Sequence, residues 1–316
     1  MVGLNDIHQA RQQISSIVLK TPLVSSKQLS AKCGNHIFLK GEHLQKTGSF
    51  KIRGAANKVQ DAVKEGAKFV TAASSGNHGQ AVAYIANTLG IQSTIVVPED
   101  ATESKVRAIE GYNGHVETCG TTSAERIPRA KEIAAEQKGI FIPPYDDPLI
   151  IAGQGTVGLE IMDQLDEIDI VIVPIGGGGL ISGILTAIKE TNPTIKIIGV
   201  EPESANDTYL SLKHHQITPI DGSSTIADGL RTTQPGDMTF PIIQKYLDDL
   251  VLVSEDDIRQ ALLFVIERTK QLIEPSSVVT VASVMFNHVN VNNQRIVCVC
   301  SGGNVDVKKL SNIFHS

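Results

Sequence analysis

The sequence predicts an α/β fold with mainly parallel sheets, and three observations support this prediction. Short apolar runs rich in branched residues alternate with helical patterns along most of the chain. Repeated strand-then-helix order is typical of parallel sheets with flanking helices. Segments rich in glycine or serine follow several of the strands. Open parallel sheets bind their ligands at such strand ends.

The apolar runs predict the strands, and the amphipathic patterns between them predict the helices. Strands are expected at 69–72, 93–97, 115–118, 168–174, 195–200, 250–253 and 295–300. Helices are expected at 81–89, 123–136, 155–164, 180–189, 254–270 and 276–287. The sequence contains no repeat of about 20 to 50 residues, which excludes solenoids and propellers.

The length of the chain predicts two lobes. At 316 residues it exceeds the usual size of a single hydrophobic core. Residues 69–143 carry three strand-and-helix steps and lead into the loop PPYDDP, whose prolines and aspartates mark a boundary. We therefore expect a small lobe at 69–143, inserted into a large lobe formed by 1–68 and 144–316.

The composition excludes several classes of protein. With 41% hydrophobic and 20% charged residues, the chain resembles a globular enzyme and not a disordered protein. A formal net charge of -6 without a long basic run argues against nucleic-acid binding. The N-terminus lacks a signal-peptide pattern, and no run of about 18 apolar residues occurs. A cytoplasmic protein without a membrane partner is therefore expected.

The four cysteines, at 33, 119, 298 and 300, are too few and too scattered for a disulfide framework. Cys298 and Cys300 alternate within the strand 295–300, so we expect both to pack on one face of a sheet. Two thiols without nearby partners fall short of a zinc site.

Four consecutive glycines follow the strand 168–174 and precede a helical pattern. They are Gly176, Gly177, Gly178 and Gly179. Glycines let backbone N–H groups approach an anion, and a helix N-terminus adds further donors, so the segment predicts a phosphate site. A flexible turn is the alternative interpretation. Dinucleotide spacing is met only loosely and no Walker lysine follows, which favours a smaller cofactor.

Lys51 lies in QKTGSFKIRG, behind a Gly-Ser-Phe turn and at the head of a helical pattern. On its own, a lysine at a helix start is usually a solvated surface charge. A lysine that reacts with a carbonyl must be partly neutral, which burial or a nearby cation achieves. The adjacent Phe50 and the polar turn before it favour such an inward-facing amine.

Two further motifs follow strands. The segment SSGNHG, which begins at Ser74 and contains Asn77 and His78, precedes a helix and suits a substrate carboxylate. A well-capped helix is the alternative, and His78 is expected to fix this loop rather than to act as a base. Ser301, in SGGN, follows the last strand and is placed to meet a heterocyclic ring nitrogen; an ordinary turn is the alternative.

In chain order, the four motifs are QKTGSFKIRG, SSGNHG, the four glycines and SGGN. Together they resemble fold-type II pyridoxal-phosphate enzymes, with a fold like that of the tryptophan synthase β subunit. Within them, the sequence is similar to the group of serine racemase and catabolic threonine (serine) dehydratases. The resemblance covers nearly the whole chain and implies two open, twisted, mainly parallel sheets with flanking helices. Further shared segments are KTPL (20–23), IPPYDDP (142–148), IAGQGT (151–156), TIADG (225–229), ERTKQLIEP (267–275) and SGGNVD (301–306).

The resemblance implies pyridoxal 5'-phosphate as cofactor and assigns a role to each motif. Lys51 would hold the cofactor covalently and act as acid and base on one face of it. Phe50 and Gly229 would flank its ring. Asn77 would bind the ring hydroxyl, and Ser301 would bind the ring nitrogen. Phosphate contacts are implied for Gly176, Gly177, Gly178, Gly179 and Leu180. The substrate would contact Ser74, Ser75, Asn77, His78 and Arg126.

The resemblance also implies the reaction. L-threonine would give 2-oxobutyrate and L-serine would give pyruvate, each with release of ammonia. Ser75 separates members of the group, because the racemase-like members use a serine here on the opposite face of the α-carbon, whereas many dehydratases carry alanine. This chain reads SSGNH, so serine racemase activity is expected beside the elimination.

Three more features are implied by the resemblance. A site for Mg²⁺, or for Ca²⁺ or Mn²⁺, would be formed by Glu201, the Ala205 carbonyl and Asp207. A homodimer is expected. ATP or AMP would bind as an effector at Ser25, Ser26, Lys46, Thr47, Gln80, Tyr112 and Lys270, although Lys27 departs from the apolar residue usual in that set.

Two other functions remain open. A 3-hydroxyaspartate ammonia-lyase would use a cation such as Arg126 to bind a second carboxylate. Members of that group often read GAFKFRG, and GSFKIRG in this chain favours threonine and serine. A non-catalytic amino-acid-binding protein is less consistent with the retention of Lys51 and all its partners. The preferred substrate and the ratio of racemisation to elimination stay undetermined at this stage.

Overall fold

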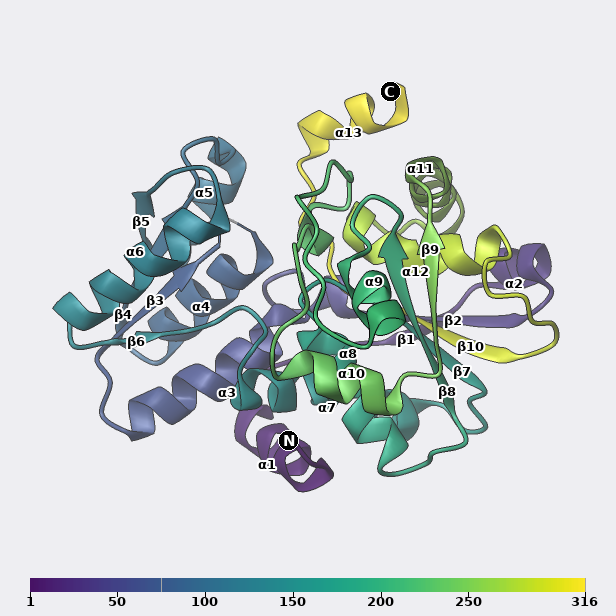
Figure 1. Cartoon of the computed structure of the whole chain (residues 1–316), viewed down its shortest axis with the longest axis horizontal. Helices are drawn as coiled ribbons and strands as arrows, with labels where there is room; N and C mark the ends of the chain where they lie inside the picture. Colours follow the sequence, from purple (N-terminus) through teal and green to yellow (C-terminus); the bar gives the residue numbers. More distant parts are fainter. Residues whose placement is uncertain (75, 316) are drawn as a thin grey trace.

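The strands of the protein form two separate sheets in the computed structural model, which describes residues 1–74 and 76–315 (Figure 1). The six-stranded sheet has the order β1-β2-β10-β7-β8-β9 and the four-stranded sheet the order β5-β4-β3-β6. The strands are β1 (Leu23–Ser25), β2 (His36–Gly41), β3 (Phe69–Ala73), β4 (Gln92–Val97), β5 (His115–Thr118), β6 (Ile140–Phe141), β7 (Ile170–Pro174), β8 (Lys196–Pro202), β9 (Asp249–Val253) and β10 (Arg295–Cys300).

Nearly all neighbouring strands run parallel. Within the described residues, only the edge pair β1 and β2 is antiparallel, with Leu23 opposite Lys40. In the parallel pair β7 and β8, Ile170 lies opposite Lys196. The predicted α/β class with two mainly parallel sheets is therefore confirmed.

Helices follow most strands, as parallel connections require. They are α1 (Leu4–Ile14), α2 (Lys27–Cys33), α3 (Lys51–Lys64), α4 (Asn77–Thr88), α5 (Glu103–Glu110), α6 (Ser123–Glu136), α7 (Pro148–Gln164), α8 (Gly179–Lys189), α9 (Asp207–His214), α10 (Thr239–Tyr246), α11 (Glu255–Phe264), α12 (Pro275–Met285) and α13 (Val307–His315). Short helical turns occur at η1 (Glu42–Leu44), η2 (Asp228–Leu230) and η3 (Val265–Thr269).

The large sheet is buried on both faces, because alternate side chains of each strand point to opposite sides. In β7, Val171 and Val173 join one apolar cluster with α7 and α8. Ile170 and Ile172 join another cluster with α11 and α12 on the opposite face. The sheet is thus a middle layer between two sets of helices.

Helix α3 connects the two sheets. Its residues Ile52, Ala55 and Val59 are fully buried and pack in the core of the small sheet. The backbone of the same helix lies against α7 of the large lobe, since a side chain at Gly153 would strike the carbonyl of Arg53. Figure 1 shows α3 running beneath the small sheet toward the large one. The helix that begins at Lys51 therefore belongs to both packing units.

Several element boundaries differ from the predicted ones. Helix α7 begins at Pro148 and not at 155, because Asp147 caps it by accepting hydrogen bonds from the N–H groups of Leu149 and Ile150. The predicted helix 254–270 divides into α11 and the π-helical turn η3, which ends where Lys270 adopts a φ of 61°. Strand β2 was not predicted, because the buried Lys40 interrupts its apolar pattern.

The prediction for the paired cysteines is confirmed. Cys298 and Cys300 are both fully buried and lie in one apolar cluster on the α12 face of the large sheet. Burial raises the pKa of the Cys300 thiol to about 12. None of the helices of the described residues has the length and hydrophobicity needed to span a membrane.

Candidate active site

The predicted motifs meet where the C-terminal ends of strands from both sheets face each other. Asn77, at the start of α4 in the small lobe, donates a hydrogen bond of 2.8 Å from Nδ2 to Glu274 in the large lobe. Its Oδ1 accepts a hydrogen bond of 2.7 Å from Nδ2 of Asn304, which follows β10. The two lobes are therefore joined by polar side chains at the edge where parallel sheets bind ligands.

Lys51 points into this junction. Its Nζ donates a hydrogen bond of 2.7 Å to the carbonyl of Pro144 and lies 5.1 Å from the centroid of the Phe50 ring. Burial lowers the pKa of Lys51 to about 8, although the nearby Glu274 carboxylate acts in the opposite direction. About a tenth of the amine is therefore neutral at pH 7, and this neutral form is the one that carbonyl chemistry requires.

The start of α3 is held against the end of β10. Phe50 N donates a hydrogen bond of 3.0 Å to the carbonyl of Ser301, and Ser49 forms an isolated β-bridge with Gly302. The Ser301 hydroxyl is buried and lies 3.1 Å from the Ser277 Oγ. Two of the predicted site residues, Lys51 and Ser301, are thus brought together by backbone contacts.

The glycine segment forms a cradle for an anion. Gly178 has a φ of 88°, and a side chain there would lie 2.7 Å from Thr239 Oγ1. Among the described residues, none accepts a hydrogen bond from the N–H of Gly176, Gly177 or Gly178, and α8 begins at the next residue. Free N–H groups at a helix start bind phosphate, so the cradle fits the phosphate of pyridoxal phosphate.

Tyr145 lines the site, and the sequence did not indicate this role. A side chain at Gly177 would lie 2.4 Å from its ring, so the ring packs directly on the glycine cradle. Tyr145 follows Pro144, whose carbonyl accepts the hydrogen bond from Lys51. Its segment, PPYDDP, was interpreted only as a lobe boundary; its position after β6, again at the C-terminal edge of a strand, was the available signal.

Glu274 is a second residue that the sequence analysis missed. It is only 5% exposed, and burial, followed by the Asp228 carboxylate, raises its pKa to about 8. Its carboxylate accepts hydrogen bonds from Asn77 Nδ2 and from the N–H of Asn304. The second Nδ2 hydrogen of Asn77 remains available for a cofactor hydroxyl.

His78 is buried, and its Nε2 lies 2.9 Å from the carbonyl of Ile142. Because a carbonyl only accepts, Nε2 carries the proton and Nδ1 does not. Burial, and then the charge of Lys51, lowers the pKa of His78 to about 3, so the imidazole is neutral. A substrate carboxylate at this loop would therefore meet backbone N–H groups at the start of α4 and not an imidazolium.

Gly229, predicted to flank the cofactor ring, lies next to the glycine cradle. Its N–H donates a hydrogen bond of 2.8 Å to Ser276 Oγ, and its carbonyl lies 3.2 Å from where a Gly176 side chain would begin. Leu180, in the first turn of α8, is buried. The residues implied for the ring and the phosphate thus form one continuous surface.

The predicted substrate residues lie at the C-terminal edge of the small sheet. Ser74 follows β3, and its Oγ accepts a hydrogen bond of 3.3 Å from the N–H of Gly76. Ser75, the residue expected to act on the second face, lies outside the described residues. Arg126 is in the first turn of α6, with Nη2 3.2 Å from Ser123 Oγ. Its Nε and Nη1 are buried without a hydrogen-bond partner in the described part of the chain.

Glu201, near the C-terminal end of β8, lies close to Asp207, the first residue of α9. Glu201 is fully buried and accepts hydrogen bonds from the N–H groups of Thr208 and Tyr209. Burial, and then the Asp207 charge, raises the pKa of Glu201 to about 8, and burial raises the pKa of Asp207 to about 7. Two buried carboxylates with raised pKa values suit a divalent cation, and each oxygen of Glu201 keeps a lone pair. A resident cation would need the Ala205 carbonyl and water as well, since the described residues contain no cluster of three or more acidic, His or Cys ligands.

Two of the residues predicted to bind a nucleotide lie together in one hollow. Ser25 and Ser26 line a hollow of about 270 Å³ together with Arg268 and Thr269. The remaining members lie outside its lining. They are Lys46, Thr47, Gln80, Tyr112 and Lys270.

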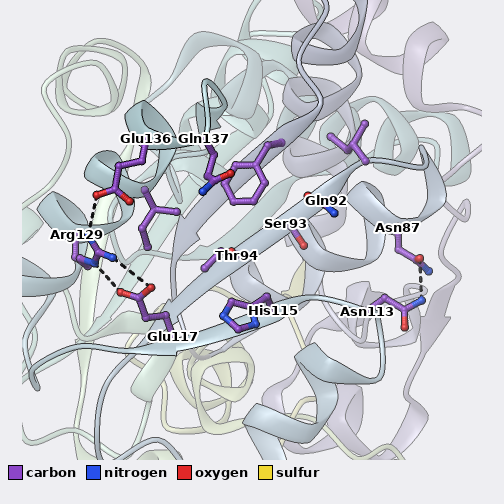
Figure 2. Close-up of a pocket in the computed structure, with 13 residues that line it drawn as sticks. Asn87, Gln92, Ser93, Thr94, Asn113, His115, Glu117, Arg129, Glu136 and Gln137 are labelled. Carbon is purple, nitrogen blue, oxygen red and sulfur yellow. Dashed lines mark hydrogen bonds and ion pairs between the residues drawn. The ribbon is translucent and has the colours of Figure 1, made fainter.

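A larger groove, of about 570 Å³, lies on the small lobe away from these motifs (Figure 2). Its lining includes Phe69, Gln92 and His115, which are the first residues of β3, β4 and β5. Arg129 lies across it, with Nε 2.6 Å from Glu117. The groove is therefore at the N-terminal ends of the strands, the opposite end from the ligand-binding edge.

A half-buried lysine with a lowered pKa, an anion cradle at a helix start and a serine at a neighbouring strand end define a site for a phosphate-bearing carbonyl cofactor. Comparison with known proteins agrees. Residues 14–302 match the model of the pyridoxal-phosphate dependent enzyme family, and the chain belongs to this family.

Relatives and solved structures resemble the whole chain. It is 43% identical to the catabolic L-threonine dehydratase of Escherichia coli (strain K12), covering 99% of this chain and 96% of the relative. It is 41% identical to the serine racemase of Dictyostelium discoideum, covering 99% and 98%. The structure of maize serine racemase superposes with a TM-score of 0.95 at 36% identity, covering 99% and 97% of the two chains.

Proposed function

We propose that the protein is a pyridoxal-phosphate-dependent ammonia-lyase that converts L-threonine to 2-oxobutyrate and L-serine to pyruvate. The observation that carries the proposal is the Lys51 amine, whose pKa is lowered to about 8 by burial and which lies at the same edge as the glycine cradle. The threonine dehydratase and serine racemase named above, both more than 40% identical to this chain, support the same substrates.

Bound pyridoxal phosphate supplies an electron sink for the substrate carbon that loses its proton. The chain supplies the rest. Lys51 Nζ takes the α-proton and returns a proton to the departing β-hydroxyl, while the N–H groups of Gly176, Gly177 and Gly178 hold the phosphate. The N–H groups at the start of α4 bind the substrate carboxylate. The Ser301 hydroxyl would be the neutral partner of the ring nitrogen, and the absence of a carboxylate partner would favour prompt loss of the β-hydroxyl.

The test is to incubate the purified chain with pyridoxal phosphate, reduce it with borohydride and locate the adduct by peptide mass spectrometry. We expect an absorbance band in the visible range, an adduct on Lys51, and 2-oxobutyrate with ammonia from L-threonine. A folded protein that takes up no cofactor would instead support the non-catalytic amino-acid-binding alternative. The Lys51→Ala variant is the control for nonspecific reduction.

Serine racemase activity is the second part of the proposal. The serine racemases of Dictyostelium and maize support it, as does the second serine of the SSGNH motif. Lys51 and Ser75 would exchange the α-proton from opposite faces of the substrate.

The 3-hydroxyaspartates remain an alternative substrate class. The Nε and Nη1 atoms of Arg126, which have no partner among the described residues, favour a second carboxylate at this position, because a guanidinium pairs readily with one. Comparing product formation from L-threonine, L-serine, D-serine and the 3-hydroxyaspartates decides the class. Arg126→Gln would reduce activity toward 3-hydroxyaspartate far more than toward threonine if Arg126 binds that carboxylate.

Four further features are part of the proposal. Mg²⁺, or Ca²⁺ or Mn²⁺, would bind Glu201, Asp207 and the Ala205 carbonyl. A nucleotide such as ATP or AMP would act as an effector. Measuring the initial rate of the reaction at increasing nucleotide concentration tests this. The chain would form a homodimer, which sedimentation measures. The small lobe, 69–143, would move against the large lobe, 1–68 and 144–316, to admit substrate.

A further inference from the structure

Arg53 lies two residues beyond Lys51, in the same turn of α3, and it is fully buried. Successive helical residues are rotated by about 100°, so the two side chains leave the helix on nearly opposite sides. Lys51 reaches Pro144 in the site, while Arg53 reaches into the interior of the large lobe. The first turn of α3 is therefore held from two sides.

Arg53 has two acidic partners from different elements. Glu42, in η1 after β2, accepts hydrogen bonds from Nε at 2.7 Å and from Nη2 at 2.8 Å. Glu160, on α7, accepts from Nη1 at 2.7 Å and from Nη2 at 2.9 Å. The remaining Nη1 hydrogen is directed to Thr156 Oγ1, at 3.2 Å. The five donors of the guanidinium are thus all used.

The network continues to a second buried cation. Lys40, on β2, is fully buried and donates to Glu160 Oε2 at 2.6 Å. Its other two hydrogens are directed to the carbonyl of Thr21 at 2.8 Å and to Gln164 Oε1 at 2.9 Å. Two cations and two carboxylates therefore balance in charge, and every donor of both cations has an acceptor.

Such a network is expensive to bury and is weak evidence for stability, because apolar side chains of similar volume often stabilise a core as well. The network instead fixes the orientation of the Arg53 side chain, because a planar guanidinium bonded to two carboxylates permits one orientation. The two carboxylates belong to the large lobe, and the helix they hold begins with Lys51.

We infer that Arg53, held by Glu42 and Glu160, is a positioning residue that sets the first turn of α3 so that the Lys51 amine lies at the carbonyl of Pro144. The inference rests on the proposed role of Lys51. Arg53 acts through the backbone and touches neither substrate nor cofactor. The ionisable groups that bear directly on Lys51 are Glu274, at the start of α12, and His78, on α4.

The test is Arg53→Lys in the full-length protein, which keeps the charge and loses the two-sided geometry. Each variant is equilibrated with pyridoxal phosphate over a pH series and reduced with borohydride, and the fraction of Lys51 that carries the adduct is measured by mass spectrometry. The midpoint of trapping is the pH at which half of Lys51 carries the adduct. We expect it to rise by about one pH unit or more, because a displaced amine regains water and its pKa returns toward the ordinary value. We also expect kcat for L-threonine to fall by about 100-fold, with KM changed far less.

Leu262→Ala is the matched control, because Leu262 is a fully buried residue of α11. It should lower the melting temperature without moving the midpoint of trapping. An Arg53→Lys protein that is less stable but keeps the midpoint and kcat of the unsubstituted chain overturns the inference. If Arg53→Lys does not fold, Glu160→Asp carries the same test, because it keeps the charge and shortens the reach. Failure of the unsubstituted chain to trap cofactor on Lys51 would overturn the proposed function instead.

Discussion

The Lys51 amine donates a hydrogen bond of 2.7 Å to the carbonyl of Pro144, which joins the helix of the reactive residue to the segment between the lobes. A carbonyl accepts a hydrogen bond from an ammonium and from a neutral amine, and the bond from the ammonium is the stronger of the two. The burial around it favours the neutral form and lowers the pKa of Lys51 to about 8. The contact therefore orients the amine without removing its reactivity.

The first prediction concerns the pH dependence of cofactor capture. Only the neutral Lys51 amine attacks a carbonyl, and its folded-state pKa of about 8 lies below the ordinary value. The capture rate should therefore rise about tenfold per pH unit below pH 8 and level off above it. Stopped-flow absorbance of metal-free, cofactor-free protein mixed with pyridoxal phosphate measures this. A rate that keeps rising toward pH 10 would contradict it, and Lys51→Arg is the control without a reactive amine.

The second prediction concerns Ser75. Replacing it by alanine removes the group proposed for the second face of the α-carbon but leaves Lys51 in place. D-serine formation from L-serine should fall by at least about 100-fold, while pyruvate formation from L-serine should change by less than about fivefold. Chiral chromatography of serine together with a pyruvate assay measures both. Equal loss of the two activities would show that Ser75 serves binding and not proton transfer, and Ser74→Ala gives the comparison at the neighbouring hydroxyl.

The third prediction concerns Glu201 and Asp207. Their pKa values in the folded chain are raised to about 8 and about 7. At a pH between the ordinary pKa of a carboxyl group and its raised pKa, the folded chain therefore binds more protons than the unfolded chain. Their contribution to stability is present at low pH and is lost as pH rises toward 8. Bound Mg²⁺ would relieve this loss. At a Mg²⁺ concentration about 100 times the Kd, the melting temperature should rise by roughly 4 °C at pH 8.

The same increase should be much smaller at pH 6, because protons then occupy both carboxyl groups. Glu201→Gln provides the matched control, since its amide resembles the protonated acid in size and charge. It should raise the metal-free melting temperature at pH 8 and abolish the response to Mg²⁺. Calorimetry in two buffers should record proton release on Mg²⁺ binding, and its absence would argue against a metal at this pair.

The fourth prediction concerns an ion pair between the lobes. Lys105, on α5, lies 2.7 Å from a carboxylate oxygen of Asp228, which adjoins Gly229 in η2. The pair is partly exposed, so its contribution is at most about 1 kcal/mol. Lys105→Met should therefore raise the KM for L-threonine by up to about fivefold with little change in kcat, because it removes a contact between α5 and η2 and leaves Lys51 in place.

Arg107→Ala tests whether that effect is specific. Arg107 is on the same helix and pairs with Glu103 within α5, so its loss leaves the contact between lobes intact. Its KM should equal that of the unsubstituted chain. High salt should reduce the difference between Lys105→Met and the unsubstituted chain. A KM that is unchanged in Lys105→Met at low salt would show that the pair does not hold the lobes together.

Much of the site could be predicted because its residues are contiguous in sequence. The four glycines and the start of α8 form the phosphate cradle from adjacent positions, and Lys51 follows directly on the turn that presents it. Alternating apolar strands and amphipathic helices likewise predicted parallel sheets with flanking helices. These features depend on local spacing and on the chemistry of neighbouring residues, which a single sequence records.

The rest depended on residues that are distant in sequence. Glu274 meets Asn77, Tyr145 covers Gly177, and Arg53 is held by Glu160, yet no pattern near any of them indicates its partner. Strand β2 was missed for the same reason, since the carboxylates that compensate the charge of the buried Lys40, Glu42 and Glu160, are not its neighbours in the strand.

By itself, the sequence determined the fold class through periodicity, and it predicted the reactive lysine and the anion cradle from adjacent residues. The tertiary structure decided which groups tune and hold that lysine. The pKa of Lys51 depends on burial by both lobes, and the orientation of its helix depends on carboxylates from η1 and α7. Burial and charge pairing are properties of three-dimensional packing, and one strand or helix alone does not contain them.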